Sequence, residues 1–225
     1  MDSYLVTGGA GFIGSTFVKA LVADGDHVVN LDKLTYAGEG GNLEGWRDNP
    51  LHILVVGDIA DKELVRELLD QHQPRYVVNF AAESHVDRSI DDPVPFLQSN
   101  VTGCVHLLEQ VRKYWDHLPA PRRSAFRYLQ VSTDEVYGTL GAAGCFVETT
   151  AYAPNSPYAA SKAAADHFVR AYHRTFGVPT LTTHSTNNYG PFQHVEKLIP
   201  RVIVNALTGR PIPVYGDGLH VRDWL

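Results

Sequence analysis

The chain has 225 residues, of which 44% are hydrophobic and 20% are charged, and its formal net charge is −6. This composition excludes a disordered chain, because it supplies enough apolar side chains to build a core. It also argues against nucleic acid as a partner, because a negative chain without a basic run cannot neutralise phosphates. No apolar run is long enough to cross a membrane, so we expect a cytoplasmic protein without a membrane partner.

The first element along the chain is a short strand, Ser3–Thr7, that leads directly into a glycine-rich turn. The turn, Gly8 to Gly14, reads Gly-Gly-Ala-Gly-Phe-Ile-Gly, and apolar residues at helical spacing follow it. It contains both Gly-x-Gly-x-x-Gly and Gly-x-x-Gly-x-x-Gly. In a strand–turn–helix unit this pattern predicts a dinucleotide site, because glycines let a pyrophosphate approach the helix N-terminus. A glycine turn without a ligand is the alternative.

The second strand, His27–Leu31, supports a dinucleotide site because it ends in a carboxylate. Asp32 follows Gly14 by eighteen residues, close to the spacing at which such a carboxylate binds the adenosine ribose. Asp32 would repel a 2′-phosphate, so the pattern favours NAD over NADP. The neighbouring Lys33 weakens that preference.

Strand and helix patterns alternate from there to about residue 185. Further strands are expected at Ile53–Val56, Tyr76–Phe80, Tyr128–Val131 and Thr180–Thr183, with helices at Lys62–Leu69, Phe96–Tyr114 and Tyr158–Phe176. This alternation predicts an α/β fold, a doubly wound parallel sheet of Rossmann type. The pattern then changes, with a helix expected from Glu196 to about Leu207. We therefore expect an NAD-binding domain over residues 1–185, and the start of a substrate-binding lobe over residues 186–225.

The segment Val-Ser-Thr-Asp-Glu-Val-Tyr-Gly, at residues 131–138, places two acids where a buried strand is expected to end. Neighbours on a strand point to opposite faces, so Asp134 and Glu135 can share a pocket only if the strand has ended. The carboxyl ends of strands are where open α/β sheets bind ligands. The alternative is a capping box, with Ser132 as N-cap and Glu135 reaching back, which is favoured for an isolated match.

Tyr158 and Lys162 lie one helical turn apart and therefore share a helix face. A phenol beside an ammonium can act as a base toward a hydroxyl group. The spacing alone is a weak signal, and it gains weight from the glycine-rich turn.

Other reactive residues point to no further chemistry. Cys104 and Cys145 are the only cysteines, and we expect free thiols in a reducing compartment. The eleven histidines lack metal-ligand spacing, so no metal site is expected. His85 is interpreted as a polar wall of a pocket.

Together these motifs resemble the extended short-chain dehydrogenases/reductases that act on nucleotide sugars. The segments 81–89, 132–138, 157–162, 196–200, 213–218 and 222–225 resemble the dTDP-glucose 4,6-dehydratase branch of that family, and the similarity covers essentially the whole chain. Sugar 4-epimerases of the same family usually have small or hydroxyl residues in place of Asp134 and Glu135. The acidic pair therefore favours dehydration over epimerisation.

The resemblance implies catalytic roles for Thr133, Asp134, Glu135, Tyr158 and Lys162. Tyr158, as a phenolate stabilised by Lys162, would take the 4-hydroxyl proton while C4 passes hydride to NAD. Thr133 would bind the C4 oxygen. Glu135 would then remove the C5 proton, and a protonated Asp134 would protonate the departing 6-hydroxyl. Hydride return to C6 would leave a 4-keto-6-deoxy sugar. Close like charges push two pKa values apart, which suits this division of roles.

The resemblance also implies the binding residues and the assembly. NAD would contact Gly8, Gly11, Phe12, Ile13, Gly14, Asp32, Lys33, Thr35, Asp58, Ile59, Ala81, Ala82, Tyr158, Lys162 and Asn188. dTDP-glucose would contact Ser84, Thr133, Asn187, Lys197, Leu198, Tyr215 and Arg222. A homodimer would form through the helices Phe96–Tyr114 and Tyr158–Phe176, as in the dimers of this family.

The chain departs from the family in two places near the expected pocket. His184-Ser185-Thr186 stands where Arg-Cys-Ser or Asn-Cys-Ser is common, and Val195 stands where Pro is common. Family members also continue well beyond Leu225, so we expect an incomplete substrate lobe. Another nucleotide-sugar dehydratase or a 4-epimerase, acting on a UDP- or GDP-sugar, stays open as an alternative. So does a catalytically degenerate NAD-binding protein.

Overall fold

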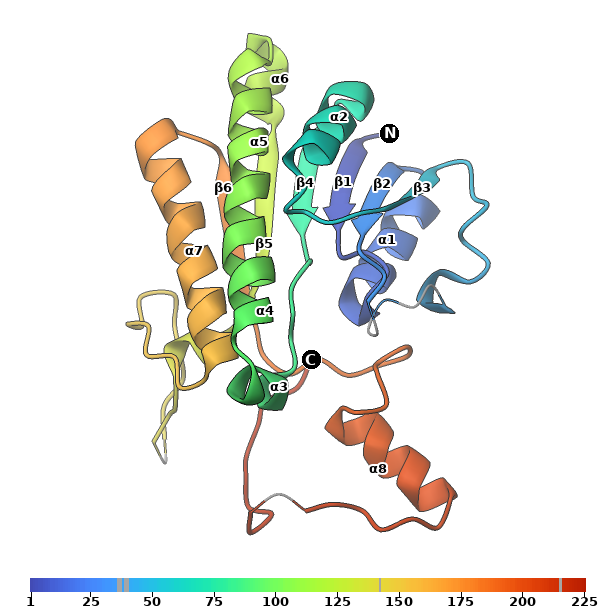
Figure 1. The fold of residues 1–225 in the computed structure, drawn as a ribbon, viewed down its shortest axis with the longest axis vertical. Helices are drawn as coiled ribbons and strands as arrows, with labels where there is room; N and C mark the ends of the chain where they lie inside the picture. The colour runs from blue at the N-terminus through green and yellow to red at the C-terminus, as the bar shows by residue number, and fades with distance from the viewer. Residues whose placement is uncertain (36–37, 39–40, 142, 215) are drawn as a thin grey trace.

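The computed structural model describes residues 1–35, 38, 41–141, 143–214 and 216–225. Within them, six parallel strands form one sheet in the order β3-β2-β1-β4-β5-β6 (Figure 1). The strands are β1 (Ser3–Thr7), β2 (His27–Asp32), β3 (His52–Val56), β4 (Tyr76–Asn79), β5 (Arg127–Thr133) and β6 (Thr180–Ser185). Helices connect them on both faces, which confirms the doubly wound α/β fold.

The strand order reverses at β1, and this reversal places the glycine-rich turn at the middle of the sheet's carboxyl edge. Thr7, the last residue of β1, pairs with Leu31 of β2 on one side and with Asn79 of β4 on the other. Open parallel sheets bind ligands at such a switch point, because the loops leaving the two central strands turn to opposite faces.

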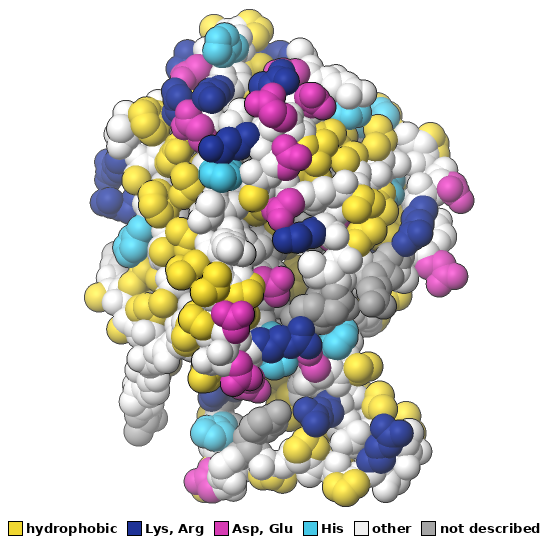
Figure 2. Space-filling model, in the orientation of Figure 1, with side chains coloured by type: hydrophobic (Ala, Val, Ile, Leu, Met, Phe, Trp, Pro, Cys, Tyr) yellow, Lys and Arg dark blue, Asp and Glu magenta, His cyan; other side chains and the backbone are white. Residues whose placement is uncertain are grey.

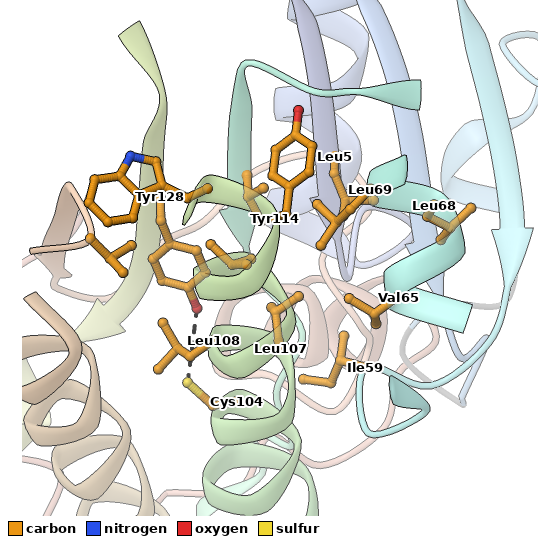
Figure 3. Packing of buried hydrophobic residues seen from close by; sticks show 14 of the residues in the cluster. Leu5, Ile59, Val65, Leu68, Leu69, Cys104, Leu107, Leu108, Tyr114 and Tyr128 are labelled. Atoms are coloured by element: carbon orange, nitrogen blue, oxygen red, sulfur yellow. Dashed lines mark hydrogen bonds between the residues drawn. The ribbon is translucent and has the colours of Figure 1, made fainter. Parts of the chain in front are cut away.

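One face of the sheet is covered by α2 (Lys62–His72), α5 (Cys104–His117) and α7 (Pro157–Phe176) (Figure 1). Leu107 and Leu108 of α5 belong to the same buried cluster as Leu68 and Leu69 of α2, as Figure 3 shows. Each fully buried aliphatic side chain contributes about 1.5–3 kcal/mol. This packing fixes α7, and therefore Tyr158 and Lys162, against the sheet.

The opposite face carries a smaller core under α1 (Phe12–Ala23). Val18 and Val22 of this helix pack with Val6 of β1 and Val28 of β2, and Leu43 of the short 3₁₀ turn η1 (Gly41–Leu43) closes the cluster. The first helix is thus anchored directly behind the glycine-rich turn.

The helix expected at Phe96–Tyr114 is interrupted. It consists of α4 (Val94–Phe96), a π-helical segment η2 (Leu97–Gly103) and α5. Within η2, the Asn100 side chain accepts from the Glu83 amide at 2.8 Å and donates to the Glu83 carbonyl and to Ser161 Oγ, both at 2.9 Å. These tertiary bonds stabilise the wider turn, a type often found near functional sites.

Two short helices were not predicted, and one helix starts later than expected. The additional helices are α3 (Val86–Asp91) and α6 (Ala120–Ala125). The last helix, α8 (Leu198–Leu207), begins two residues after Glu196. It extends away from the carboxyl edge of the sheet in Figure 1. The boundary at residues 185 and 186 stays a prediction.

Residues 186–225 contact the rest of the chain through side chains. Lys197 Nζ donates to the Ser84 carbonyl at 3.3 Å, and Glu196 pairs with Arg88 at 3.3 Å. Within the segment, Asn187 and Trp224 form a parallel bridge, and the Leu225 amide donates to the Asn187 carbonyl at 2.8 Å. Across the described part of the chain, no helix is long and apolar enough to cross a membrane. The same residues contain no group of three or more His, Cys, Asp or Glu side chains that could hold a metal ion.

Candidate active site

A cavity of about 440 Å³ opens at the carboxyl edge of the sheet, around the reversal of strand order. Residues that follow each of the six strands contribute to its wall. All fifteen residues that the sequence assigns to NAD binding lie in this wall. The structure therefore brings the predicted cofactor residues together in one place.

The glycines of the first turn have different tasks. Gly8 has φ +72°, and a Cβ there would lie 2.6 Å from the Ala81 amide nitrogen. A Cβ at Gly14 would collide with the Gly8 carbonyl, so this position needs glycine for close packing of helix on strand. At Gly11 a Cβ would meet only the Gly8 carbonyl oxygen, at 3.4 Å. Gly11 is thus the position that a ligand, rather than the fold, requires to be small.

Asp32 is buried at the end of β2 and fixes the glycine-rich turn. Its carboxylate accepts from the amides of Ala10 and Leu34, both at 2.8 Å. Burial raises the pKa of Asp32, and these two hydrogen bonds oppose the rise. Beside it, Lys33 forms an ion pair with Asp58 at 2.7 Å. The carboxylate therefore orders the turn while it lines the cavity.

Strand β5 ends at Thr133, and a 3₁₀ turn, η3 (Asp134–Tyr137), begins directly after it. Asp134 and Glu135 therefore lie outside the strand, and this was the condition for both side chains to share a pocket. The capping-box alternative assigned the N-cap to the wrong residue. Thr133, not Ser132, caps the turn by accepting from the Glu135 amide, whereas Ser132 donates to Asp166 at 2.7 Å.

The acidic pair is asymmetric in its exposure to the cavity. Glu135 is among the wall residues, whereas its neighbour Asp134 is not among the described residues of the wall. Burial raises the pKa of Glu135, the charge of Asp134 raises it further, and Lys197 and Arg222 oppose the rise. The environment of Glu135 therefore opposes its ionisation, as expected where two carboxyl groups lie close together.

Tyr158 and Lys162 both reach the cavity from the first turns of α7. The Tyr158 amide donates to Ser89 Oγ at 3.1 Å, and Lys162 Nζ donates to the Val131 carbonyl at 2.7 Å. Burial raises the pKa of Tyr158, and the charge of Glu135 adds to the rise. Burial lowers the pKa of Lys162. The protein groups alone thus disfavour the phenolate that the family mechanism requires.

The residues assigned to the sugar nucleotide are only partly brought together. Ser84, Thr133, Asn187 and Lys197 line the cavity, and Lys197 Nζ donates to the Ser84 carbonyl at 3.3 Å. Leu198 and Arg222 are exposed and lie outside the wall as described. Tyr215 lies outside the described residues.

Sequence reasoning missed Glu196, a wall residue whose carboxylate joins two parts of the chain. It forms an ion pair with Arg88 at 3.3 Å, and His85 Nε2 lies 3.4 Å from the same carboxylate. His85 itself caps α3, where its Nδ1 accepts from the Arg88 amide. Glu196 directly precedes Lys197, which the sequence assigns to substrate binding. This position was the signal that could have identified it.

The chain is similar to known proteins over its whole length. A sequence model of the GDP-mannose 4,6 dehydratase family matches residues 5–225. The chain therefore belongs to that family. This result confirms the resemblance to the extended short-chain dehydrogenases/reductases that act on nucleotide sugars.

The chain is also similar to individual proteins and solved structures. The dTDP-glucose 4,6-dehydratase of Xanthomonas campestris pv. campestris is 63% identical over 225 residues, which are 100% of this chain and 64% of the relative. The crystal structure of the Bacillus anthracis dTDP-glucose 4,6-dehydratase in complex with NAD has a TM-score of 0.90 at 45% identity, covering 100% and 67% of the two chains.

A more distant neighbour is UDP-glucuronic acid 4-epimerase from Bacillus cereus, in complex with UDP-glucuronic acid and NAD. Its TM-score is 0.88 at 28% identity, and the match covers 99% of this chain and 68% of that one. The fold is therefore shared between dehydratases and epimerases, so the side chains of the site have to distinguish them.

Proposed function

We propose that the chain carries the catalytic centre of an NAD-dependent dTDP-glucose 4,6-dehydratase, a hydro-lyase of deoxysugar biosynthesis. The observation that carries the proposal is the convergence of Thr133, Glu135, Tyr158 and Lys162 on the cavity that also contains the glycine-rich turn. The 63% identity to the Xanthomonas dehydratase supports it. The chain spans 64% of that relative, so the activity, substrate and partners of the whole protein are part of the proposal.

The donor set of the cavity suits NAD. Gly11 leaves open space at the N-terminus of α1, where backbone amides can donate hydrogen bonds to a pyrophosphate. Asp32 and Asp58 line the part of the cavity that follows β2 and β3, where an adenosine ribose would be held. Bound NAD supplies the hydride acceptor for C4 oxidation and the hydride donor for C6 reduction.

The proton transfers in this proposal are carried out by Tyr158, Glu135 and Asp134. Tyr158 takes the proton of the sugar 4-hydroxyl, and Thr133 at the end of β5 orients the C4 oxygen. Positive charge beside the phenol, from Lys162 and a nicotinamide, has to offset the burial that raises the pKa of Tyr158. A 4-ketone acidifies the C5 proton, which Glu135 can remove from its place in the cavity wall.

Elimination of water needs a proton donor for the 6-hydroxyl, and we assign this role to Asp134. The Thr133 hydroxyl donates to Asp134 Oδ1 at 3.4 Å, which holds the carboxyl group beside the reacting residues. A carboxyl group donates a proton only in its protonated form, so in this proposal Asp134 carries the proton when Glu135 acts as the base.

The nucleotide side of the substrate is assigned to residues 187–222. Lys197 reaches the cavity, and its charge acts on Glu135, as does that of Arg222. An arginine fork suits a diphosphate because it donates two parallel hydrogen bonds.

The proposal is tested by following deuterium from C4 of dTDP-glucose in the presence of NAD. A dehydratase moves the label from C4 to C6, and the product is lighter by one water. A 4-epimerase returns the label to C4 without loss of water. UDP- and GDP-glucose, offered in parallel, test the nucleotide. Label that remains at C4 in an epimerised sugar would establish the alternative.

We also propose that the whole enzyme is a homodimer that works in the cytoplasm. Phe168 and Phe176 of α7 are 41% and 45% exposed, and Leu97 beside α5 is 53% exposed. Figure 2 shows hydrophobic side chains on the side of the molecule where Figure 1 places α5 and α7. Cys104 and Cys145 are both free, which suits a reducing compartment. Light scattering should show a dimer that Phe168→Glu dissociates, and a monomer at all concentrations contradicts the assignment.

A further inference from the structure

A buried carboxylate lies directly behind the proposed catalytic residues. Asp166 of α7 is 4% exposed. Its Oδ2 accepts from Ser132 Oγ at 2.7 Å and from Tyr152 at 3.3 Å, and it lies 3.2 Å from His184 Nε2. Oδ1 of the same carboxylate is buried and has no hydrogen-bond partner among the described residues. A charge so placed is costly, so it is expected to have a function.

The spacing of Asp166 connects it to the reacting pair. Tyr158, Lys162 and Asp166 follow one another at intervals of four residues and therefore share one face of α7. Lys162 donates a hydrogen bond to the carbonyl of Val131, and Asp166 accepts one from the hydroxyl of the next residue, Ser132. Two successive turns of α7 thus hold two successive residues of β5, immediately before Thr133.

Lys162 depends on Asp166 for electrostatic balance. Its side chain is buried, and burial lowers the pKa of its ammonium group, whereas the charge of Asp166 raises it. The other titratable group that acts on Lys162 is Cys104 of α5. Burial raises the pKa of that thiol to about 11, so the thiol is neutral at physiological pH. Asp166 is therefore the anion that balances the buried ammonium.

The groups that surround Asp166 come from several elements. They are Ser132 and Tyr128 of β5, Cys104 of α5, His184 of β6, Tyr137 of η3, Tyr152 of the loop before α7, and Tyr158 and Lys162 of α7 itself. The basic side chains of this set are Lys162 and His184.

We propose that Asp166 is a positioning residue of the Tyr158–Lys162 pair, which holds the end of β5 and balances the Lys162 ammonium, with His184 as its partner. The importance of the pair for hydride transfer rests on the proposed function. His184 meets the carboxylate through Nε2, 3.2 Å from Asp166 Oδ2. An arginine at this position would place a permanent positive charge against the carboxylate.

The proposal predicts the titration of Lys162 in the unliganded chain. The chain contains six lysines, so ¹³Cε resonances can be followed one by one, and the signal lost in Lys162→Met identifies the relevant one. In Asp166→Asn, the midpoint of Lys162 should fall by about one pH unit, because removing a nearby opposite charge disfavours the charged form. Ser132→Ala removes a hydrogen bond but no charge, and it should leave the midpoint in place.

A second variant tests the same charge without removing Asp166. His184→Arg places a permanent cation against the carboxylate and should also lower the Lys162 midpoint. An unchanged midpoint in both Asp166→Asn and His184→Arg, or an equal fall in Ser132→Ala, would overturn the proposal. The measurement needs neither NAD nor turnover, so its outcome is independent of whether the chain proves to be a dehydratase.

Discussion

Residues 1–185 and residues 186–225 contribute to the same cavity in different ways. The first segment supplies its part of the wall from strand ends and helix starts that are fixed by two buried clusters. The second supplies Thr186, Asn187, Asn188, Gln193, His194, Glu196 and Lys197, and none of the ten described residues of α8 is buried. The comparison indicates that the sheet fixes the cofactor side of the cavity, whereas a few polar contacts fix its sugar side.

Polar side-chain contacts connect the second segment to the first. Lys197 donates to the Ser84 carbonyl, and Glu196 pairs with Arg88. Exposed polar contacts of this kind contribute about 0–1 kcal/mol each. Substitutions should therefore act very differently in the two segments.

The largest effect is expected at the reacting phenol of the first segment. Tyr158→Phe removes the acceptor for the 4-hydroxyl proton, so reduction of NAD by the sugar should slow by about 10²–10⁴-fold, the usual contribution of a general base. NAD affinity should change little, because the phenyl ring remains. Rapid-mixing absorbance and calorimetric titration measure the two quantities, and loss of affinity without loss of rate contradicts the assigned role.

The acidic pair should give a split result, with a large effect on the second step alone. Asp134→Asn and Glu135→Gln should each slow loss of water by about 10²–10⁴-fold, while NAD is still reduced by the sugar. Stopped-flow absorbance and product mass separate the two steps. If both variants dehydrate the sugar at the wild-type rate, the pair serves only to begin the turn after β5.

One tryptophan in each segment allows the packing of the two segments to be compared directly. Trp115 of α5 is 8% exposed, whereas Trp224 is 38% exposed and stacks edge-on against Tyr189. Trp115→Ala should lower the free energy of unfolding by about 3–5 kcal/mol. Trp224→Ala should lower it by only about 1 kcal/mol. Urea titrations measure both, and equal losses would show that the second segment is packed as firmly as the first.

The glycine-rich turn allows a matched pair of identical changes. In Gly14→Ala the added methyl group collides with the Gly8 carbonyl. This change should therefore lower the free energy of unfolding by about 1–3 kcal/mol. Gly11→Ala should leave stability close to wild type but weaken NAD binding, because its methyl group enters the space left for a ligand. Thermal denaturation and NAD titration separate the two. If Gly11→Ala binds NAD as tightly as wild type, the pyrophosphate does not lie at this turn.

The smallest effect is a pH dependence of stability. The folded-state pKa of Glu135 lies above its unfolded value, so this residue favours the folded state at low pH. That contribution is lost as pH rises through the folded pKa. Glu135→Gln should therefore raise the melting temperature at neutral pH and alter it less in acid. The exposed Glu44→Gln serves as control. A melting temperature that falls at neutral pH contradicts the raised pKa.

Local signals were sufficient for much of the fold. The strand–turn–helix unit of Gly8 to Gly14 could be predicted because glycine spacing and apolar periodicity are properties of one short segment. The interruption of the Phe96–Tyr114 helix could not, because it depends on Asn100 bonding to Glu83 and Ser161. Those partners lie in other parts of the sequence.

The candidate site shows the same limit of local reasoning. Ser132 matched a capping box in sequence, but Asp166, 34 residues away, takes its hydroxyl. Asp166 itself could have been suspected, since it continues the four-residue spacing of Tyr158 and Lys162. His184 could not be connected to it before the register of β5 and β6 placed Ser132 opposite His184.

Hydrogen–deuterium exchange of the chain, with and without NAD, tests the contrast between the two segments most directly. Amides of β1, β5 and α7 should exchange slowly in the free chain, and those of residues 186–225 should exchange rapidly. NAD should further protect the glycine-rich turn and the end of β2, and should have less effect on α8. Equal protection of both segments in the free chain, or an absence of NAD-dependent protection at Gly8 to Gly14, would contradict the account.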